Sequence, residues 1–167
     1  MYRRIMVAVD GSPTSTRGLD EALKLAQSGG ARLHVLNVVD EGMTVPAIFI
    51  PIAIMPQYID ALKESGSIAL KAAAAAAARK HLKADCAQRE SFGRSVSDVI
   101  LDEAKAWGAD VLVMGTHGRR GLNRLLLGSD AERVLREAPV PVLLVRGDKL
   151  KARGKAGRGR KGMHAAR

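Results

Sequence analysis

The sequence has few aromatic residues and a single cysteine. Aromatic side chains make up only 3% of the 167 residues, whereas hydrophobic residues as a whole make up 47%. The core must therefore be built from Val, Ile, Leu and Ala, a composition that favours a buried parallel sheet over a β-sandwich. The lone cysteine, Cys86, excludes an intramolecular disulfide and a cysteine cluster for zinc. The chain length corresponds to one domain.

Signatures of metal binding and of membrane insertion are also lacking. The four histidines are scattered, without the H-x-x-x-H or H-E-x-x-H spacing of zinc sites, so no metal site is predicted. No segment approaches the about 20 consecutive apolar residues that a membrane-spanning helix needs. The apolar run near the amino terminus reaches Asp10 almost at once, which is too short for a signal peptide. We therefore expect a soluble, cytoplasmic protein.

Acidic residues are absent from the carboxyl-terminal end of the chain. The net charge is +10, but residues 149–167 hold eight Lys and Arg and no acid, which leaves 19 basic and 17 acidic residues, or +2, for residues 1–148. Residues 148–167 have no apolar periodicity and are predicted to be a disordered basic tail after a domain of residues 1–147. Its charge can attract nucleic acid or anionic surfaces non-specifically. Without aromatic residues for stacking, we expect no sequence-specific reading.

Short apolar runs alternate with helical patterns five times along the chain. This alternation predicts a five-stranded parallel sheet with helices on both faces, a Rossmann-like α/β fold. Ser12, Ser95 and Ser129 are candidate start signals for three of the helices. The strands are expected at residues 4–9, 33–39, 86–91, 110–114 and 140–145, and a long helix at residues 60–82.

An uncharged stretch, residues 42–59, separates the second predicted strand from this long helix. Prolines occur in it every five residues, at positions 46, 51 and 56. Because prolines so closely spaced exclude a regular helix or a central strand, the stretch is predicted to be an apolar insertion loop that can contain short helical turns.

A glycine-rich loop follows the fourth predicted strand. Two residues separate Gly115 from Gly118, and nine more separate Gly118 from Gly128 and Ser129, where the next helix begins. Glycines let backbone N–H groups approach a ligand, and a helix amino terminus favours anions. Three arginines, at positions 119, 120 and 124, add positive charge. The loop predicts a phosphate cradle, and the alternative is that the glycines only make turns while Ser129 only caps its helix.

The spacing G-x2-G-x9-G-S resembles the nucleotide signature of the universal stress protein family, in its ATP-binding branch. The segments IMVAVDGS at residues 5–12, DVLVMG at 110–115 and VPVLLV at 140–145 are also similar to the family's patterns, so the resemblance covers about residues 1–147. It implies an adenine nucleotide alpha hydrolase-like fold, ATP with Mg²⁺ as ligand, and a nucleotide-dependent role in the stress response. It also implies a homodimer formed through the fifth strand, whose apolar sequence at a sheet edge favours pairing as well.

The resemblance assigns roles to the matching positions. Asp10 would hydrogen-bond the ribose or the adenine edge, and the backbone of Val38 would contact adenine, whereas their structural alternatives are a turn residue and a core residue. His117 suits a phosphate contact as well as a basic role. The full set of predicted nucleotide-binding residues is Ala8, Val9, Asp10, Val38, Met114, Gly115, His117, Gly118, Arg119, Gly128, Ser129 and Asp130.

Asp130 departs from the family pattern, which has a small apolar residue after Gly-Ser. At about 5 Å and an effective dielectric of about 20, a carboxylate and a phosphate charge repel by about 3 kcal/mol before screening, and Mg²⁺ or an outward rotamer would remove this repulsion.

No nucleophile with an adjacent base is evident, so no catalytic residue is predicted and at most slow ATP hydrolysis is expected. Two other functions stay open, a dimeric interaction module without nucleotide binding and an ATP-using enzyme such as an ATP pyrophosphatase. The sequence DGSP at residues 10–13 argues against the second, because a Ser-Gly-Gly loop would be expected there.

Overall fold

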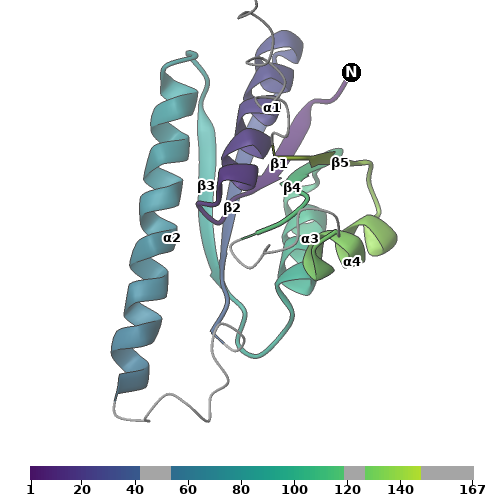
Figure 1. Ribbon diagram of the computed structural model, residues 1–167. Helices are drawn as coiled ribbons and strands as arrows, with labels where there is room; N and C mark the ends of the chain where they lie inside the picture. The colour runs from purple at the N-terminus through teal and green to yellow at the C-terminus, as the bar shows by residue number, and fades with distance from the viewer. Residues whose placement is uncertain (42–53, 119–126, 148–167) are drawn as a thin grey trace, which may run out of the picture.

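The computed structural model describes residues 1–41, 54–118 and 127–147. Five strands form one parallel sheet in the order β3-β2-β1-β4-β5, with helices on both faces (Figure 1), which confirms the predicted fold class. The elements in chain order are β1 (Arg4–Ala8), α1 (Pro13–Gly29), β2 (Arg32–Val39), α2 (Met55–Ala78), β3 (Ala84–Glu90), α3 (Val96–Trp107), β4 (Val111–Gly115), α4 (Ser129–Glu137) and β5 (Val142–Val145).

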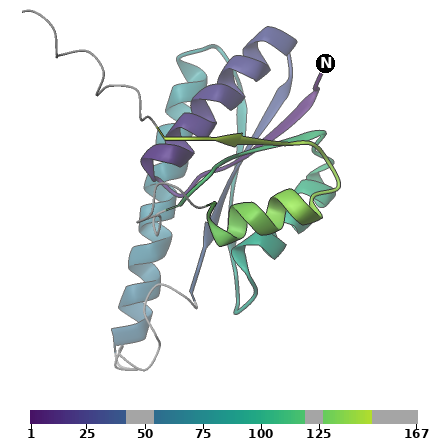
Figure 2. The same cartoon turned by 45° about the vertical axis from the view of Figure 1, so that its right-hand side comes forward.

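Strand β1 lies at the centre of the sheet and is covered on both faces. Its side chains alternate, so that Ile5 and Val7 pack with residues of α1 and α2, whereas Met6 packs with residues of α3 and α4. Ile5 pairs with Leu33 of β2 on one side and with Val111 of β4 on the other. Figure 2, turned by 45°, shows α4 in front of the sheet and α2 at its far edge.

The amino-terminal caps of three helices can be compared with the start signals predicted from the sequence. The side chains of Ser12 and Ser95 each accept a hydrogen bond from a backbone N–H three residues on, at 3.1 Å, as predicted. In α4 the cap is Gly128, with φ −65° and ψ 146°, and Ser129 is the first helical residue. The prediction that Ser129 caps this helix is therefore wrong, because the extended backbone that a cap needs falls one residue earlier.

Helix α2 begins before the predicted position. It starts at Met55 instead of Asp60, so residues 55–59 of the predicted insertion loop are helical, and it ends at Ala78. The exclusion of a helix by proline is wrong for Pro56, which lies in the first turn, where a missing N–H breaks no hydrogen bond. Three residues of this helix are buried, Gly66, Ala73 and Ala77.

Strands β3 and β5 lie at the two edges of the sheet, as predicted for the fifth strand. The remainder of the predicted loop (42–53), the arginine-containing span (119–126) and the predicted basic tail (148–167) lie outside the described residues. In the part of the chain that the structure describes, no helix combines the length and the apolar character needed to cross a bilayer.

Candidate functional site

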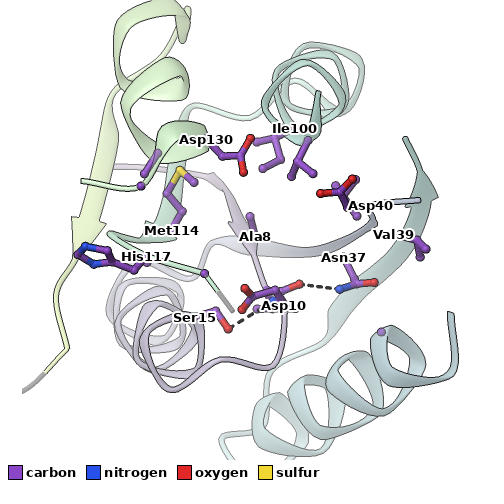
Figure 3. A pocket seen from close by; sticks show the side chains of 18 of the residues that line it. Ala8, Asp10, Ser15, Asn37, Val39, Asp40, Ile100, Met114, His117 and Asp130 are labelled. Carbon is purple, nitrogen blue, oxygen red and sulfur yellow. Dashed lines mark hydrogen bonds between the residues drawn. The ribbon is translucent and has the colours of Figure 1, made fainter. Parts of the chain in front are cut away.

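The topology of the sheet places a pocket at its carboxyl edge. From β1 the chain moves outward through β2 and β3, and it then crosses back to β4 and β5 on the other side of β1. In open α/β sheets such a reversal leaves a crevice beyond the carboxyl ends of the strands. A pocket of about 370 Å³ lies there, within the range of small-molecule sites (Figure 3).

Most of the residues predicted from the sequence come together in this pocket. Eleven of the twelve line it, although they belong to β1, β2, β4, α4 and the loops that follow the strands. Arg119 lies outside the described residues. The eleven are Ala8, Val9, Asp10, Val38, Met114, Gly115, His117, Gly118, Gly128, Ser129 and Asp130.

Asp10 is fixed where β1 turns into α1. Its Oδ1 accepts a hydrogen bond from the N–H of Ser12 at 2.9 Å, and its own N–H donates to Oγ of Ser15 at 3.3 Å. Its Oδ2 lies so close to Gly118 that a Cβ there would be 2.6 Å from it. Asp10 is thus a turn residue that also lines the pocket, and Gly118 is needed because the carboxylate occupies the space of a side chain.

The loop between β4 and α4 is closed by backbone contacts. The N–H of Gly128 donates to the carbonyl of Thr116 at 2.9 Å, and the hydroxyl of Thr14 donates to the carbonyl of His117. These bonds place the amino terminus of α4, with the backbone N–H groups of its first turn, beside Gly118. An anion that enters the pocket would meet these donors.

His117 has a different orientation from the other predicted residues. Its Nδ1 lies 3.0 Å from the hydroxyl of Thr116, and Figure 3 shows its ring pointing away from Asp10. The ring is therefore not directed at the centre of the pocket. A role as a general base needs hydrogen-bond reach to a bound group, and this orientation does not favour it.

Nine further residues line the pocket and were missed by sequence reasoning. Asn37 is one for which the sequence held a signal, because it is the polar interruption of an apolar strand. The helix that contributes Leu62 and Gly66 has no local pattern that predicts packing over a pocket. The nine are Ser15, Asn37, Val39, Asp40, Leu62, Gly66, Val96, Ile100 and Ala131.

Three carboxylates from three different elements line the pocket. Asp10 follows β1, Asp40 follows β2, and Asp130 lies in the first turn of α4 (Figure 3). The described lining residues include no Lys or Arg. The amino terminus of α4 supplies about half a positive charge. An anionic ligand is therefore favoured at the α4 end. A cation bound with it would reduce the repulsion between the ligand and the three carboxylates.

Helix α2 is anchored beside the pocket through Lys63. Its ammonium lies 2.9 Å from a carboxylate oxygen of Glu90, and this hydrogen bond lowers the pKa of Glu90 and raises the pKa of Lys63. The backbone carbonyl of Lys63 accepts a hydrogen bond from the side chain of Gln88 at 2.9 Å. Burial, together with the neighbouring Glu90, raises the pKa of Glu41. These contacts fix the wall that Leu62 contributes.

Comparison with known proteins identifies many similar sequences. The Universal stress protein family matches residues 1–146. A universal stress protein of Methanocaldococcus jannaschii is 34% identical over 147 residues, which cover 87% of this chain and 83% of that protein. The universal stress protein YxiE of Bacillus subtilis is 32% identical over 151 residues, which cover 87% of this chain and all of that protein.

Solved structures share the fold as well. A universal stress protein family member from Burkholderia pseudomallei is 35% identical with a TM-score of 0.66, over 84% of this chain and 93% of that one. One from Archaeoglobus fulgidus was solved in complex with dAMP (22% identity, TM-score 0.64, covering 86% and 98%). One from Arabidopsis thaliana was solved with AMP bound (19% identity, TM-score 0.64, covering 88% of this chain and 93% of that one). At these lower identities the likeness concerns the fold alone.

Proposed function

We propose, since the chain belongs to the universal stress protein family, that it binds an adenine nucleotide in the pocket beyond β1, β2 and β4. The ligand we propose is ATP with Mg²⁺, and the role is that of a nucleotide-dependent regulator of the stress response. The observation that carries this proposal is that eleven residues predicted from strand ends and from the glycine loop line one pocket of suitable volume.

The pocket has different chemistry at its two ends. Apolar side chains, Val38 and Ile100 among them, lie at the β2 and α3 end and suit a purine. The amino terminus of α4, with Gly128 and Ser129, suits phosphates. Asp10 lies between β1 and the glycine loop, where its carboxylate can accept hydrogen bonds from ribose hydroxyls. Two relatives of the same fold hold AMP and dAMP, which supports an adenine nucleotide.

Mg²⁺ accompanies ATP in this proposal. In nucleotide sites Mg²⁺ is usually held by one or two carboxylates together with the phosphates of the substrate. Asp130 is a carboxylate in the first turn of α4, at the end of the pocket that suits phosphate. A cation shared between Asp130 and the phosphates would turn the departure from the family pattern into a favourable contact. ATP hydrolysis is not part of the proposal.

The experiment that tests the proposal is a nucleotide panel on the purified protein. Melting temperature and titration calorimetry with AMP, ATP and ATP with Mg²⁺ should show binding, and GTP with Mg²⁺ should bind more weakly. Mass spectrometry of the gently purified protein should detect an adenine nucleotide that has co-purified. If no adenine nucleotide raises the melting temperature or gives heat of binding, the protein is an interaction module instead.

We also propose that two copies pair through β5. This strand lies at an edge of the sheet, and Leu143 is 37% exposed on it. An edge strand with an exposed apolar side chain tends to pair, and a two-fold homodimer would cover both copies of the edge.

For the basic tail, residues 148–167, we propose non-specific contact with nucleic acid or another anionic surface in the cytoplasm. Eight basic residues without an acidic one in residues 149–167 support an electrostatic role.

A further inference from the structure

After the last backbone hydrogen bond between β1 and β2, the backbone N–H and carbonyl of one residue of β2 are left open. The N–H of Val9 donates to the carbonyl of Leu36 at 2.8 Å, so Leu36 faces β1. The carbonyl of Val39 accepts from the N–H of Ser91 at 3.0 Å, so Val39 faces β3. Because bonding directions alternate along a strand, the N–H and carbonyl of Val38 face the β1 side.

If the parallel ladder continued, the N–H of Val38 would donate to the carbonyl of Val9. Among the described residues no backbone hydrogen bond joins these two groups. The side chain of Asn37 takes the place of this bond instead, since its Nδ2 donates to the carbonyl of Val9 at 2.8 Å. The N–H of Val38 therefore remains directed at the pocket that Val38 lines, and among the described residues no backbone N–H of β1 or of the turn after it donates to the Val38 carbonyl.

Asn37 is held in one orientation by its neighbours. It is 3% exposed, and its Oδ1 accepts a hydrogen bond from Nε2 of Gln88 at 3.2 Å. The same Nε2 donates to the carbonyl of Lys63 in α2 at 2.9 Å. Figure 3 shows the amide nitrogen of Asn37 on the side of Asp10. If the Asn37 amide were flipped, its Oδ1 would face the Val9 carbonyl oxygen and its Nδ2 would face Nε2 of Gln88, two contacts between like groups. The network therefore fixes the Asn37 donor toward Val9.

Gly66 is the position at which α2 approaches this amide pair. A Cβ at Gly66 would lie 2.1 Å from Oδ1 of Asn37 and 2.3 Å from Nε2 of Gln88. A glycine in the interior of a helix otherwise rich in alanine is destabilising relative to alanine. The close approach gives that glycine a physical reason, because any side chain would displace the pair.

We propose that Asn37 is a positioning residue that keeps the backbone N–H of Val38 open, so that this N–H and the Val38 carbonyl can read a purine base. An adjacent N–H and carbonyl match an edge of adenine, which offers N1 as acceptor beside the N6 amino donor. Guanine presents O6 as acceptor beside N1–H as donor, the reverse order, so the same pair disfavours it. The inference rests on the proposed adenine nucleotide site and names the device that selects its base.

The first test is Asn37→Leu, which removes the side-chain donor. The carbonyl of Val9 is then free to accept the N–H of Val38, and the ladder should gain this bond. Amide hydrogen exchange at Val38, measured by NMR on the ligand-free protein, should slow by about tenfold or more. The affinity for AMP should fall about tenfold, the equivalent of one hydrogen bond, and the AMP-to-GMP preference should shrink by a similar factor. Binding of ribose 5-phosphate, which lacks a base, should not change.

The second test is Gly66→Ala, with Ser67→Ala on the same turn as its control. The added methyl should displace Asn37 from Val9 and reduce the AMP-to-GMP preference. Ser67→Ala also adds an alanine to α2 but does not approach the amide pair. Gly66→Ala keeps the test decisive if Asn37→Leu does not fold.

Two outcomes would overturn the inference. One is a Val38 amide that already exchanges slowly in the natural protein. The other is natural protein that binds AMP selectively and keeps the same selectivity in both variants. If the natural protein binds no adenine nucleotide, the proposed function is overturned instead. Amide hydrogen exchange at Val38 then still decides whether Asn37 keeps the N–H of Val38 open.

Discussion

The contact between Gly118 and Asp10 predicts that Gly118→Ala weakens nucleotide binding while the fold persists. A Cβ at position 118 would lie 2.6 Å from Oδ2 of Asp10, whereas ordinary contact begins at 3.4 Å, so one group must move by about 0.8 Å. Asp10 cannot retreat freely, because its Oδ1 accepts the N–H of Ser12 at 2.9 Å. Either the carboxylate or the loop at Gly118 must therefore shift, and both line the pocket that would hold the ligand.

The size of the effect follows from the bond that is lost. A hydrogen bond to a charged group contributes about 1.5–3 kcal/mol. Losing the one between Asp10 and the ligand corresponds to a weakening of about 10- to 100-fold, since each 1.4 kcal/mol is tenfold. Isothermal titration calorimetry with AMP, and with ATP and Mg²⁺, measures this change directly. The melting temperature of the ligand-free protein should change little, because the loop can yield at an exposed residue.

A matched variant and a double mutant make the test specific. Gly29→Ala adds the same methyl at the end of α1, where it would meet the Tyr2 carbonyl at an ordinary 3.4 Å, and should bind like the natural protein. In an Asp10→Ala background, Gly118→Ala should cost no further affinity, because the crowded carboxylate is gone. Additive losses in the double mutant, or full affinity in Gly118→Ala, would refute this reasoning.

Four further results are expected. Asp130→Ala should tighten ATP binding in Mg²⁺-free buffer by removing a repulsion, and calorimetry with and without Mg²⁺ should show the gain shrinking when the cation is present. Leu143→Glu should convert a dimer into a monomer at micromolar concentration, because it places like charges opposite each other at the paired edge; a natural protein that is already monomeric by light scattering contradicts the dimer. Deletion of residues 148–167 should abolish retention of duplex DNA, while nucleotide binding persists. In the full chain, the logarithm of the DNA-binding constant plotted against the logarithm of the salt concentration should have a slope of about −7 for eight phosphate contacts. The hydrogen bond with Ser95 lowers the pKa of Asp98, so the contribution of this carboxylate to stability is present above the ordinary Asp pKa and is lost as the pH falls through the lowered value. Asp98→Asn should therefore reduce the melting temperature at pH 7, and the reduction should shrink as the pH is lowered through the acidic range.

The fold could be predicted because its signals are local. Apolar runs separated by capping serines and glycines define the strands and helices without knowledge of distant contacts. The prediction failed where two local signals compete. Proline breaks a helix in its interior but is tolerated in a first turn, as at Pro56. Serine and glycine both suit a cap, so the pattern that indicates Ser129 does not exclude Gly128 one residue earlier.

The site was predictable only at strand ends and in the glycine loop. Asn37 finds its partners 28 residues earlier, at Val9, and 51 residues later, at Gln88. No periodicity in the sequence reports contacts over such separations. The requirement that a buried amide be satisfied indicates that partners exist, but only the packing of β1, β3 and α2 around β2 shows which they are. Gly66 weakens an alanine-rich helix, but nothing local in the sequence shows that Asn37 and Gln88 are what it approaches.

The central place of β1 has a consequence for the order in which the protein is made. Ile5 pairs with Val111, so about 100 residues must be synthesised before β1 gains its second neighbour. At about 5–20 residues per second, the nascent chain spends about 5–20 seconds with its central strand open along one edge. The phosphate end of the pocket arrives later still, with α4. A nucleotide that binds as proposed would therefore not template the early chain. It would stabilise only the finished domain, so its binding would report that translation of the domain is complete.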